Sequence, residues 1–161
     1  FHRINLAEFF QDCVEDVGLD LESKNIELNY SNLVDPSTRI IADPEQLKKV
    51  IDNIVGNSIK YMDKPKGVIN IRILDEVDSV RVEIEDNGKG ISTKDLGKIF
   101  ERFYRTDASR NSSTGGSGIG LSIVKKIIED HGGYIWATSK DGEGTCLHFV
   151  IRKYREAEEN E

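Results

Sequence analysis

The sequence predicts an α/β two-layer sandwich, in which one mixed, largely antiparallel sheet of about five strands carries helices on one face. Residues 68–74 and 80–84 alternate apolar and polar side chains around a short acidic turn at 75–79, which is typical of a β-hairpin. Segments with apolar residues at i, i+3 and i+4 flank that hairpin and predict helices with one apolar face. Because hairpin strands are antiparallel, a doubly wound parallel sheet is disfavoured.

Length and charge restrict the class of protein. The chain has 161 residues, about one domain, and its 37% hydrophobic and 32% charged residues are typical of a globular protein. A net charge of −7 disfavours a broad attraction to nucleic acid or anionic lipid, so we expect no nucleic-acid partner. No apolar run approaches the roughly 18 residues of a membrane span. Because the chain starts with Phe1, we expect a piece of a longer protein.

The cysteines give no sign of a special site. Cys13 and Cys146 stand in apolar contexts and form neither a CxxC motif nor a Cys/His cluster. We therefore expect packing residues in a reducing compartment, without a disulfide framework or structural zinc.

The first quarter of the chain predicts one helix and two strands. Asn5 and Glu8 are placed as an N-cap and its partner before a helix with apolar residues from Leu6 to Val17. Residues 25–30 and Arg39–Ala42 are β-like runs separated by a polar turn at 35–37. We expect these two runs to pair as neighbouring strands.

A second helix opens at Asp43 and Pro44, an N-cap carboxylate followed by a proline at the first helical position. Its predicted core stripe consists of Leu47, Val50, Ile51, Ile54, Val55 and Ile59. Asn53, Asn57 and Lys60 follow one another at i, i+4 and i+7, which places them in one polar row on another face.

The second half alternates polar loops with further elements. A DNGKG turn follows the strand at 80–84, and a short helix is expected at 93–102. The polar segment 106–114 lacks apolar periodicity and predicts a mobile loop or lid. A glycine cluster at 115–120 opens a helix through Leu121 and Val124, which ends at the glycines 132 and 133. Strands at 134–139 and 145–152 complete the fold before an acidic tail, 153–161.

Several of these polar features suit a purine nucleotide. The amide oxygen of Asn57 can complete an octahedral Mg²⁺ shell, and Lys60 can meet a phosphate. Asp86 ends a strand, so its carboxylate can accept a hydrogen bond from the exocyclic amine of adenine. Gly88 and Gly90 allow the backbone to approach a flat base. The glycine cluster offers free backbone N–H groups and a positive helix end to phosphates.

Each feature alone also has a plain structural interpretation. A DxGxG sequence is more often a tight turn, and paired asparagines on a helix are more often a solvated face. No GxxxxGK[ST] motif is present, and no strand leads into the glycine cluster, so neither a P-loop nor a dinucleotide fingerprint is available.

Together, the motifs resemble those of the catalytic, ATP-binding domain of bacterial-type sensor histidine kinases, of the GHKL (Bergerat) fold. Residues 52–61 (DNIVGNSIKY) resemble the N box, and residues 86–91 (DNGKGI) the first glycine box. Residues 100–105 (FERFYR) resemble the F box, residues 116–121 (GSGIGL) the second glycine box, and residues 144–145 (GT) the last motif. The resemblance covers residues 1–152, with 106–114 as the ATP lid.

The resemblance implies ATP and Mg²⁺ as cofactors and assigns the site. Asn57 would ligate the metal, and Asp86 would bind the adenine amino group. The nucleotide-binding residues implied are Asn53, Asn57, Lys60, Tyr61, Asp86, Gly88, Gly90, Tyr104, Arg105, Gly116, Gly118, Ile119, Gly120, Leu121 and Thr145. Three of them, Asn53, Lys60 and Arg105, would be catalytic.

The resemblance also implies the reaction and the partners. The γ-phosphate would pass to a histidine on the parent kinase's own dimerisation domain, absent here, and then to the receiver domain of a response regulator. The fragment is expected to be monomeric and cytoplasmic, and its parent a homodimer, with an inner-membrane sensor as one form of parent. His2, His131 and His148 lack the context of a phosphoacceptor.

Three alternatives share the same motifs. Hydrolytic relatives such as gyrase carry a glutamate where this chain has Asn53, whose amide cannot take a proton from water. A conformational GHKL ATPase is therefore the second hypothesis, and a catalytically silent nucleotide-binding scaffold is the third. Acid lability of the phosphorylated product would distinguish a serine kinase of similar fold.

Overall fold

The computed structural model of this chain describes residues 1–102 and 121–155. The expected lid at 106–114, the glycine cluster at 115–120 and most of the acidic tail lie outside these residues. Among the described residues no helix combines the length and the apolar character needed to cross a membrane.

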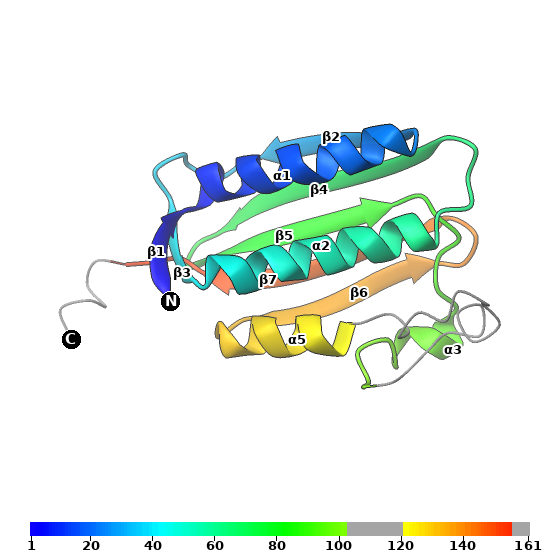
Figure 1. The fold of residues 1–161 in the computed structure, drawn as a ribbon. Coiled ribbons are helices and arrows are strands. Elements are labelled where there is room, and N and C mark those ends of the chain that lie inside the picture. Colours follow the sequence, from blue (N-terminus) through cyan, green and yellow to red (C-terminus); the bar gives the residue numbers. More distant parts are fainter. Residues whose placement is uncertain (103–120, 156–161) are drawn as a thin grey trace.

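The main sheet has five strands in the order β2-β4-β5-β7-β6 (Figure 1). The strands are β2 (Ile26–Asn32), β4 (Gly67–Glu76), β5 (Ser79–Asp86), β6 (Tyr134–Lys140) and β7 (Gly144–Arg152). Only the β2–β4 pair is parallel, and the other three pairs of this sheet are antiparallel. The predicted fold class, a mixed and largely antiparallel sheet, is confirmed.

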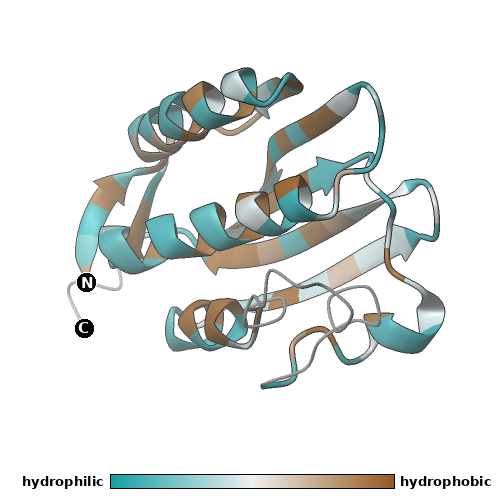
Figure 2. Ribbon diagram, turned by 45° about the vertical axis from the view of Figure 1, so that its right-hand side comes forward, coloured by the Kyte–Doolittle hydropathy of each residue, from teal (hydrophilic) through white to brown (hydrophobic). Residues whose placement is uncertain are grey.

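Three helices cover one face of this sheet, namely α1 (Leu6–Ser23), α2 (Pro44–Lys60) and α5 (Leu121–Asp130) (Figure 1). Figure 2 shows that these helices carry both hydrophilic and hydrophobic bands, as expected for surface helices. Alternate strand residues such as Val82, Ile84 and Phe149 join the helices in one core. The opposite face of the sheet carries the polar members of the alternation, such as Arg72 and Glu83.

The caps expected for the first two helices are confirmed. The Asn5 side chain accepts a hydrogen bond from the Glu8 N–H at 2.9 Å, and Asp43 accepts from the Glu45 N–H at 3.1 Å. His131 ties the start of α2 to the end of α5, because its Nε2 accepts from the Asp43 N–H at 3.1 Å. Its Nδ1 lies 2.7 Å from the Ile127 carbonyl, so Nδ1 carries the proton. His131 is therefore a structural residue.

The pairing expected between the runs at 25–30 and Arg39–Ala42 is wrong. The first run, β2, pairs in parallel with β4, and α2 lies on the connection between them. The second run, β3 (Arg39–Ala42), pairs antiparallel with β1 (His2–Asn5) in a separate two-stranded ribbon. A parallel neighbour needs a crossover connection, and α2 supplies it, so β4 takes the place beside β2.

Other boundaries differ by a few residues. The hairpin turn is only 77–78, since β4 and β5 extend to Glu76 and Ser79. The helix expected at 93–102 is α3 (Thr93–Leu96), which ends at Gly97 and continues as turns. At the start of the predicted tail, Lys153 forms a bridge with Ile40, so the main sheet and the ribbon are linked there.

Candidate functional site

A pocket lies where the C-terminal half of α2 meets the end of β5, the start of β7 and the start of α5. It is lined by Ile54, Asn57, Ser58, Tyr61, Asp86, Gly90, Ile91, Leu121, Thr145 and Leu147. The predicted site residues among these are Asn57, Tyr61, Asp86, Gly90, Leu121 and Thr145. Apolar walls with a few convergent polar groups are the usual form of a small-molecule site.

Asp86 is held in place by donors on both of its carboxylate oxygens. Oδ1 accepts from the Gly88 N–H at 2.8 Å, and Oδ2 accepts from the Ser58 hydroxyl at 2.8 Å. Burial raises the pKa of Asp86 above its ordinary value, and these hydrogen bonds, with one from the Thr145 N–H, oppose the rise. A carboxylate has about four acceptor positions, so Asp86 can accept a further hydrogen bond from a ligand.

Ser58 was missed by the sequence analysis. It is 4% exposed and lies on the buried stripe of α2, one turn after Ile54. The stripe was expected to end with Ile59, which is only half-buried. A hydroxyl on an apolar helix face was the available signal, because a buried hydroxyl requires a hydrogen-bond partner.

A second missed residue, Ser139 on β6, joins two loops beside the pocket. Its hydroxyl donates to the Gly144 carbonyl at 2.8 Å and accepts from the Ile91 N–H at 2.8 Å. The Thr145 hydroxyl lies 2.9 Å away and must donate, since the proton of Ser139 is already used. Ser139 thus fixes Thr145 relative to the turn that follows Asp86.

The glycines of this region are required by close backbone approach. Gly90 has φ +76°, and a Cβ there would lie 2.2 Å from the Lys140 carbonyl oxygen. A Cβ on Gly144, at φ +139°, would lie 2.1 Å from the Asp86 carbonyl oxygen. L-residues with side chains rarely adopt such angles, so both positions need glycine. In this structure the groups that approach Gly90 and Gly144 most closely are protein carbonyl oxygens.

Tyr61 is the C-cap of α2, lines the pocket and carries a buried hydroxyl without a hydrogen-bond partner among the described residues. The Nζ atoms of Lys89 and Lys60 lie 4.8 and 5.6 Å from its ring centroid. A buried hydroxyl without a partner is costly, so this atom is suited to a ligand or an ordered water.

Three predicted site residues lie outside the lining of the pocket. Asn53 and Lys60 share a row of α2 with Asn57, as expected from their spacing. The Asn53 amide nitrogen donates to the Lys49 carbonyl at 2.8 Å, so its amide oxygen remains the atom for a ligand. Gly88 supports Asp86 through its N–H. Its position is fixed by the Tyr61 carbonyl, 2.8 Å from where a Cβ would stand.

The remaining predicted site residues fall outside the described residues. They are Tyr104, Arg105, Gly116, Gly118, Ile119 and Gly120. Their assignment stays a prediction.

The described residues fit an adenine nucleotide with Mg²⁺. Asp86 offers an anchored acceptor, Tyr61 an orphaned hydroxyl, and Ile91 and Leu147 apolar walls for a base. Asn57 offers an amide oxygen at the same pocket, and Mg²⁺ prefers oxygen ligands. Asn57 is the residue that would hold the ion.

The two cysteines and His148 lie apart from this pocket's lining. Burial raises the pKa of Cys13 and of Cys146 to about 12, so neither thiol is a ready nucleophile. His148 Nδ1 lies 2.8 Å from a Glu83 oxygen on the outer face of the sheet. Cys146 and His148 are neighbours there, so the expectation that no cysteine belongs to a Cys/His cluster is wrong.

Residues 42–155 match the family described as histidine kinase-, DNA gyrase B- and HSP90-like ATPases. The sensor histidine kinase WalK of Bacillus subtilis is 38% identical over 133 residues, which are 81% of this chain and 21% of that protein. The sensor protein kinase WalK of Staphylococcus aureus is 39% identical over 110 residues, 68% of this chain and 26% of that protein. The chain thus spans about a quarter or less of the length of these relatives.

Solved structures agree with these matches. The catalytic domain of the histidine kinase ThkA superposes with a TM-score of 0.79 at 31% identity, covering 94% of this chain and 96% of that one. ThkA in complex with the response regulator protein TrrA gives a TM-score of 0.76 at 30% identity, covering 96% of this chain and 42% of that one.

Proposed function

Because the chain belongs to the family of histidine kinase-, DNA gyrase B- and HSP90-like ATPases and is homologous to sensor histidine kinases, we propose that it is a kinase catalytic domain. In this proposal it binds Mg·ATP and transfers the γ-phosphate to a histidine on the separate dimerisation domain of its parent kinase. The phosphate then passes to the receiver domain of a response regulator. ThkA, a structural relative, is seen with such a regulator.

Asp86 is the observation that carries the nucleotide proposal. Its carboxylate is half-buried at the end of β5, fixed by Ser58 and Gly88, and able to accept from one more donor at a pocket with apolar walls. The exocyclic amine of adenine is a donor of that kind, whereas guanine presents a carbonyl at the same ring position. Adenine specificity follows, because an unpaired buried carboxylate would face the guanine carbonyl.

The polar row of α2 supports the phosphate part of the proposal. Asn57 holds Mg²⁺, which neutralises charge on the phosphate oxygens when it is bound. Lys60, one turn away, adds positive charge at the end of the helix. Arg105, by resemblance, contributes from the base of the lid. Phosphoryl transfer depends on positioning and charge stabilisation, and these side chains supply both.

Asn53 favours transfer over hydrolysis. An amide has no basic lone pair that could take a proton from water, so the site lacks a general base at that position. We therefore expect a slow ATPase that needs an acceptor histidine from another domain. The isolated fragment is expected to be a monomer and a cytoplasmic domain. Its parent is expected to be a homodimer, with an inner-membrane sensor as one form of parent.

The test is a titration of the 161-residue chain with a non-hydrolysable ATP analogue, with and without Mg²⁺, followed by mixing with a separately made histidine domain and labelled ATP. Tight Mg²⁺-dependent binding and acid-labile label on that domain support the kinase. Steady-state ATP turnover without transfer favours a conformational ATPase, and binding without either reaction favours a silent scaffold. Absence of nucleotide binding contradicts all three.

A further inference from the structure

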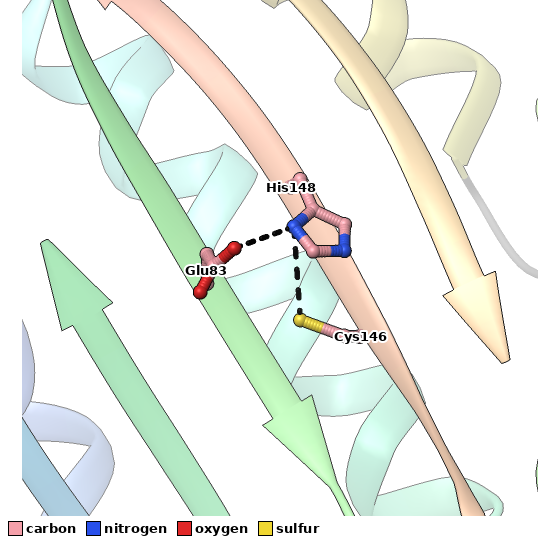
Figure 3. A group of neighbouring side chains, drawn as sticks. All are labelled: Glu83, Cys146 and His148. Carbon is pink, nitrogen blue, oxygen red and sulfur yellow. Dashed lines mark hydrogen bonds and ion pairs between the residues drawn. The ribbon is translucent and has the colours of Figure 1, made fainter. Parts of the chain in front are cut away.

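Three potential metal ligands meet on the sheet face that lies away from the helices (Figure 3). Glu83 of β5 and His148 of β7 are register partners, and Cys146 precedes His148 by two residues on the same strand face. Their strand neighbours Ile84 and Leu147 point into the core on the other side. Because successive side chains of a strand point to opposite faces of the sheet, Glu83, Cys146 and His148 lie together on the outer face.

The spacing of the ligand atoms suits a tetrahedral ion. His148 Nδ1 lies 2.8 Å from Glu83 Oε2 and 4.0 Å from Cys146 Sγ, and all three ligand atoms lie within 4.8 Å of one another. Tetrahedral Zn²⁺ with ordinary bond lengths places such N and O atoms about 3.3 Å apart, and N and S atoms about 3.6 Å apart. The two contacts of His148 differ from these values by about 0.5 Å, and the longest separation in the cluster, up to 4.8 Å, must close to about 3.6 Å through side-chain torsions.

We propose that Glu83, Cys146 and His148 bind a divalent transition-metal ion of the Zn²⁺ class, at a site separate from the nucleotide pocket. Thiolate, imidazole and carboxylate together select a borderline ion over Mg²⁺ or Ca²⁺, which prefer oxygen ligands. The fourth position falls to a water, as in zinc sites with three protein ligands.

A supporting contact orients the histidine. The second ring nitrogen, Nε2, lies 2.9 Å from the Thr138 hydroxyl. On metal binding Nδ1 must give up its proton, and the ring proton then resides on Nε2, which donates to Thr138. The Cys146 thiol releases its proton to solvent as the sulfur–metal bond forms.

The charges around the cluster are compatible with an ion. Arg72 and Arg81 both contact Glu83, at 3.1 and 3.5 Å. Each also has a second carboxylate, Glu85 for Arg72 and Glu76 for Arg81, both at 3.1 Å. Both guanidinium groups therefore keep a carboxylate partner, Glu85 or Glu76, when Glu83 binds a metal. One carboxylate and one thiolate neutralise the ion itself.

An entry path reaches the cluster from solvent. A cavity of about 500 Å³ on this face includes Cys146, Thr138 and Glu85 in its lining. His148 and Glu83 keep 13% and 12% of their side chains exposed. The ion would link β5 to β7 at the Glu83–His148 pair. The same two strands carry the register pair Asp86 and Thr145, three residues away.

The chain contains its own reporter for this site. Trp136, the single tryptophan, stacks on the His148 ring with 4.9 Å between centroids and 4° between planes. Co²⁺ bound at His148 should therefore quench the tryptophan fluorescence and, through the thiolate, produce a sulfur-to-metal absorption band. Zn²⁺ should displace Co²⁺ and restore the fluorescence.

The experiment titrates the 161-residue chain with Co²⁺ and then Zn²⁺. We expect one ion per chain, and Cys146→Ser should abolish the absorption band and weaken binding at least about 100-fold. Thr138→Val should weaken it about 10-fold. Cys13→Ser and His2→Gln are matched controls that should bind normally, and the second checks that the ion is not held by the terminal amine together with His2.

The proposal is overturned if no saturable binding occurs, if Cys146→Ser and His148→Gln bind like the parent chain, or if His2→Gln alone removes binding. Circular dichroism reports whether each variant folds. Should Cys146→Ser fail to fold, Glu83→Gln decides: it should keep the thiolate band with weakened affinity, and unchanged affinity contradicts the site.

Discussion

The hydroxyl of Ser58 on α2 donates a 2.8 Å hydrogen bond to the carboxylate of Asp86 at the end of β5. Ser58 is buried and Asp86 is half-buried, and the bond joins the helix layer to the sheet at the pocket. The orientation of Asp86 therefore depends on a residue that the motif itself does not reveal.

Ser58→Ala should lower nucleotide affinity about tenfold, because a hydrogen bond to a charged group is worth about 1.5 kcal/mol or more. Calorimetric titration with an ATP analogue measures this effect. Ser31→Ala, on an exposed position of β2, is the control and should bind normally. Equal affinity of the two variants would show that Ser58 does not position Asp86.

Asp86→Asn should remove most of the nucleotide affinity while the fold survives. The amide can present a donor where the adenine amine requires an acceptor. Nucleotide titration measures the affinity, and circular dichroism measures whether the fold survives. Asp12→Asn, on the exposed side of α1, should leave both unchanged. Near-normal binding by Asp86→Asn would contradict its assignment to adenine.

Nucleotide affinity should fall on acidification, and the fall should begin at a pH above the ordinary aspartate pKa of about 4. Burial raises the pKa of Asp86, so its proton returns at higher pH than for an exposed aspartate, and the protonated acid loses acceptor strength. Affinity measured against pH tests this. Ser58→Ala removes a hydrogen bond that favours the charged form of Asp86. The pH at which this variant loses nucleotide affinity should therefore be higher than for the parent chain. Superimposable profiles would exclude Asp86 as the titrating group.

Asn57→Asp should change the Mg²⁺ dependence of nucleotide binding. A carboxylate in place of the amide adds negative charge beside the phosphates and strengthens the metal site relative to the metal-free complex. Titration of Mg²⁺ at fixed nucleotide, compared with Asp12→Asn, measures the change. An unaltered metal requirement would remove Asn57 from the metal shell.

Gly90→Ala should destabilise the fold by more than about 1 kcal/mol. Its backbone has φ +76°, and the new Cβ would meet the Lys140 carbonyl oxygen at 2.2 Å. Urea denaturation measures the free energy of unfolding. Gly97→Ala is the matched control, because φ is −72° there and no atom lies within 4 Å of the added Cβ. Equal stability of both variants would contradict this account of Gly90.

Most of the fold could be predicted from local pattern. The caps Asn5 and Asp43, the hairpin and the helix that starts at Leu121 are encoded by neighbours within a few residues. The partner of β2 could not be predicted, because it depends on which distant strand the crossover through α2 brings alongside. Local pattern carries no information on that choice.

The candidate site divides in the same way. Asn57 and Asp86 were predicted from residue type and spacing, and both line the pocket. Their roles toward the metal and adenine stay predictions. Ser58 and Ser139 were missed, since a single hydroxyl has meaning only beside the group it contacts.

The amino-acid sequence alone therefore predicted the class of fold, the helices and most strands, and six of the residues that line the pocket, because these follow from short-range patterns and residue type. Tertiary structure alone decided strand order, the support of Asp86, and the meeting of Glu83 with Cys146 and His148. Those features arise where strands distant in sequence pair, and the register of that pairing fixes which side chains become neighbours.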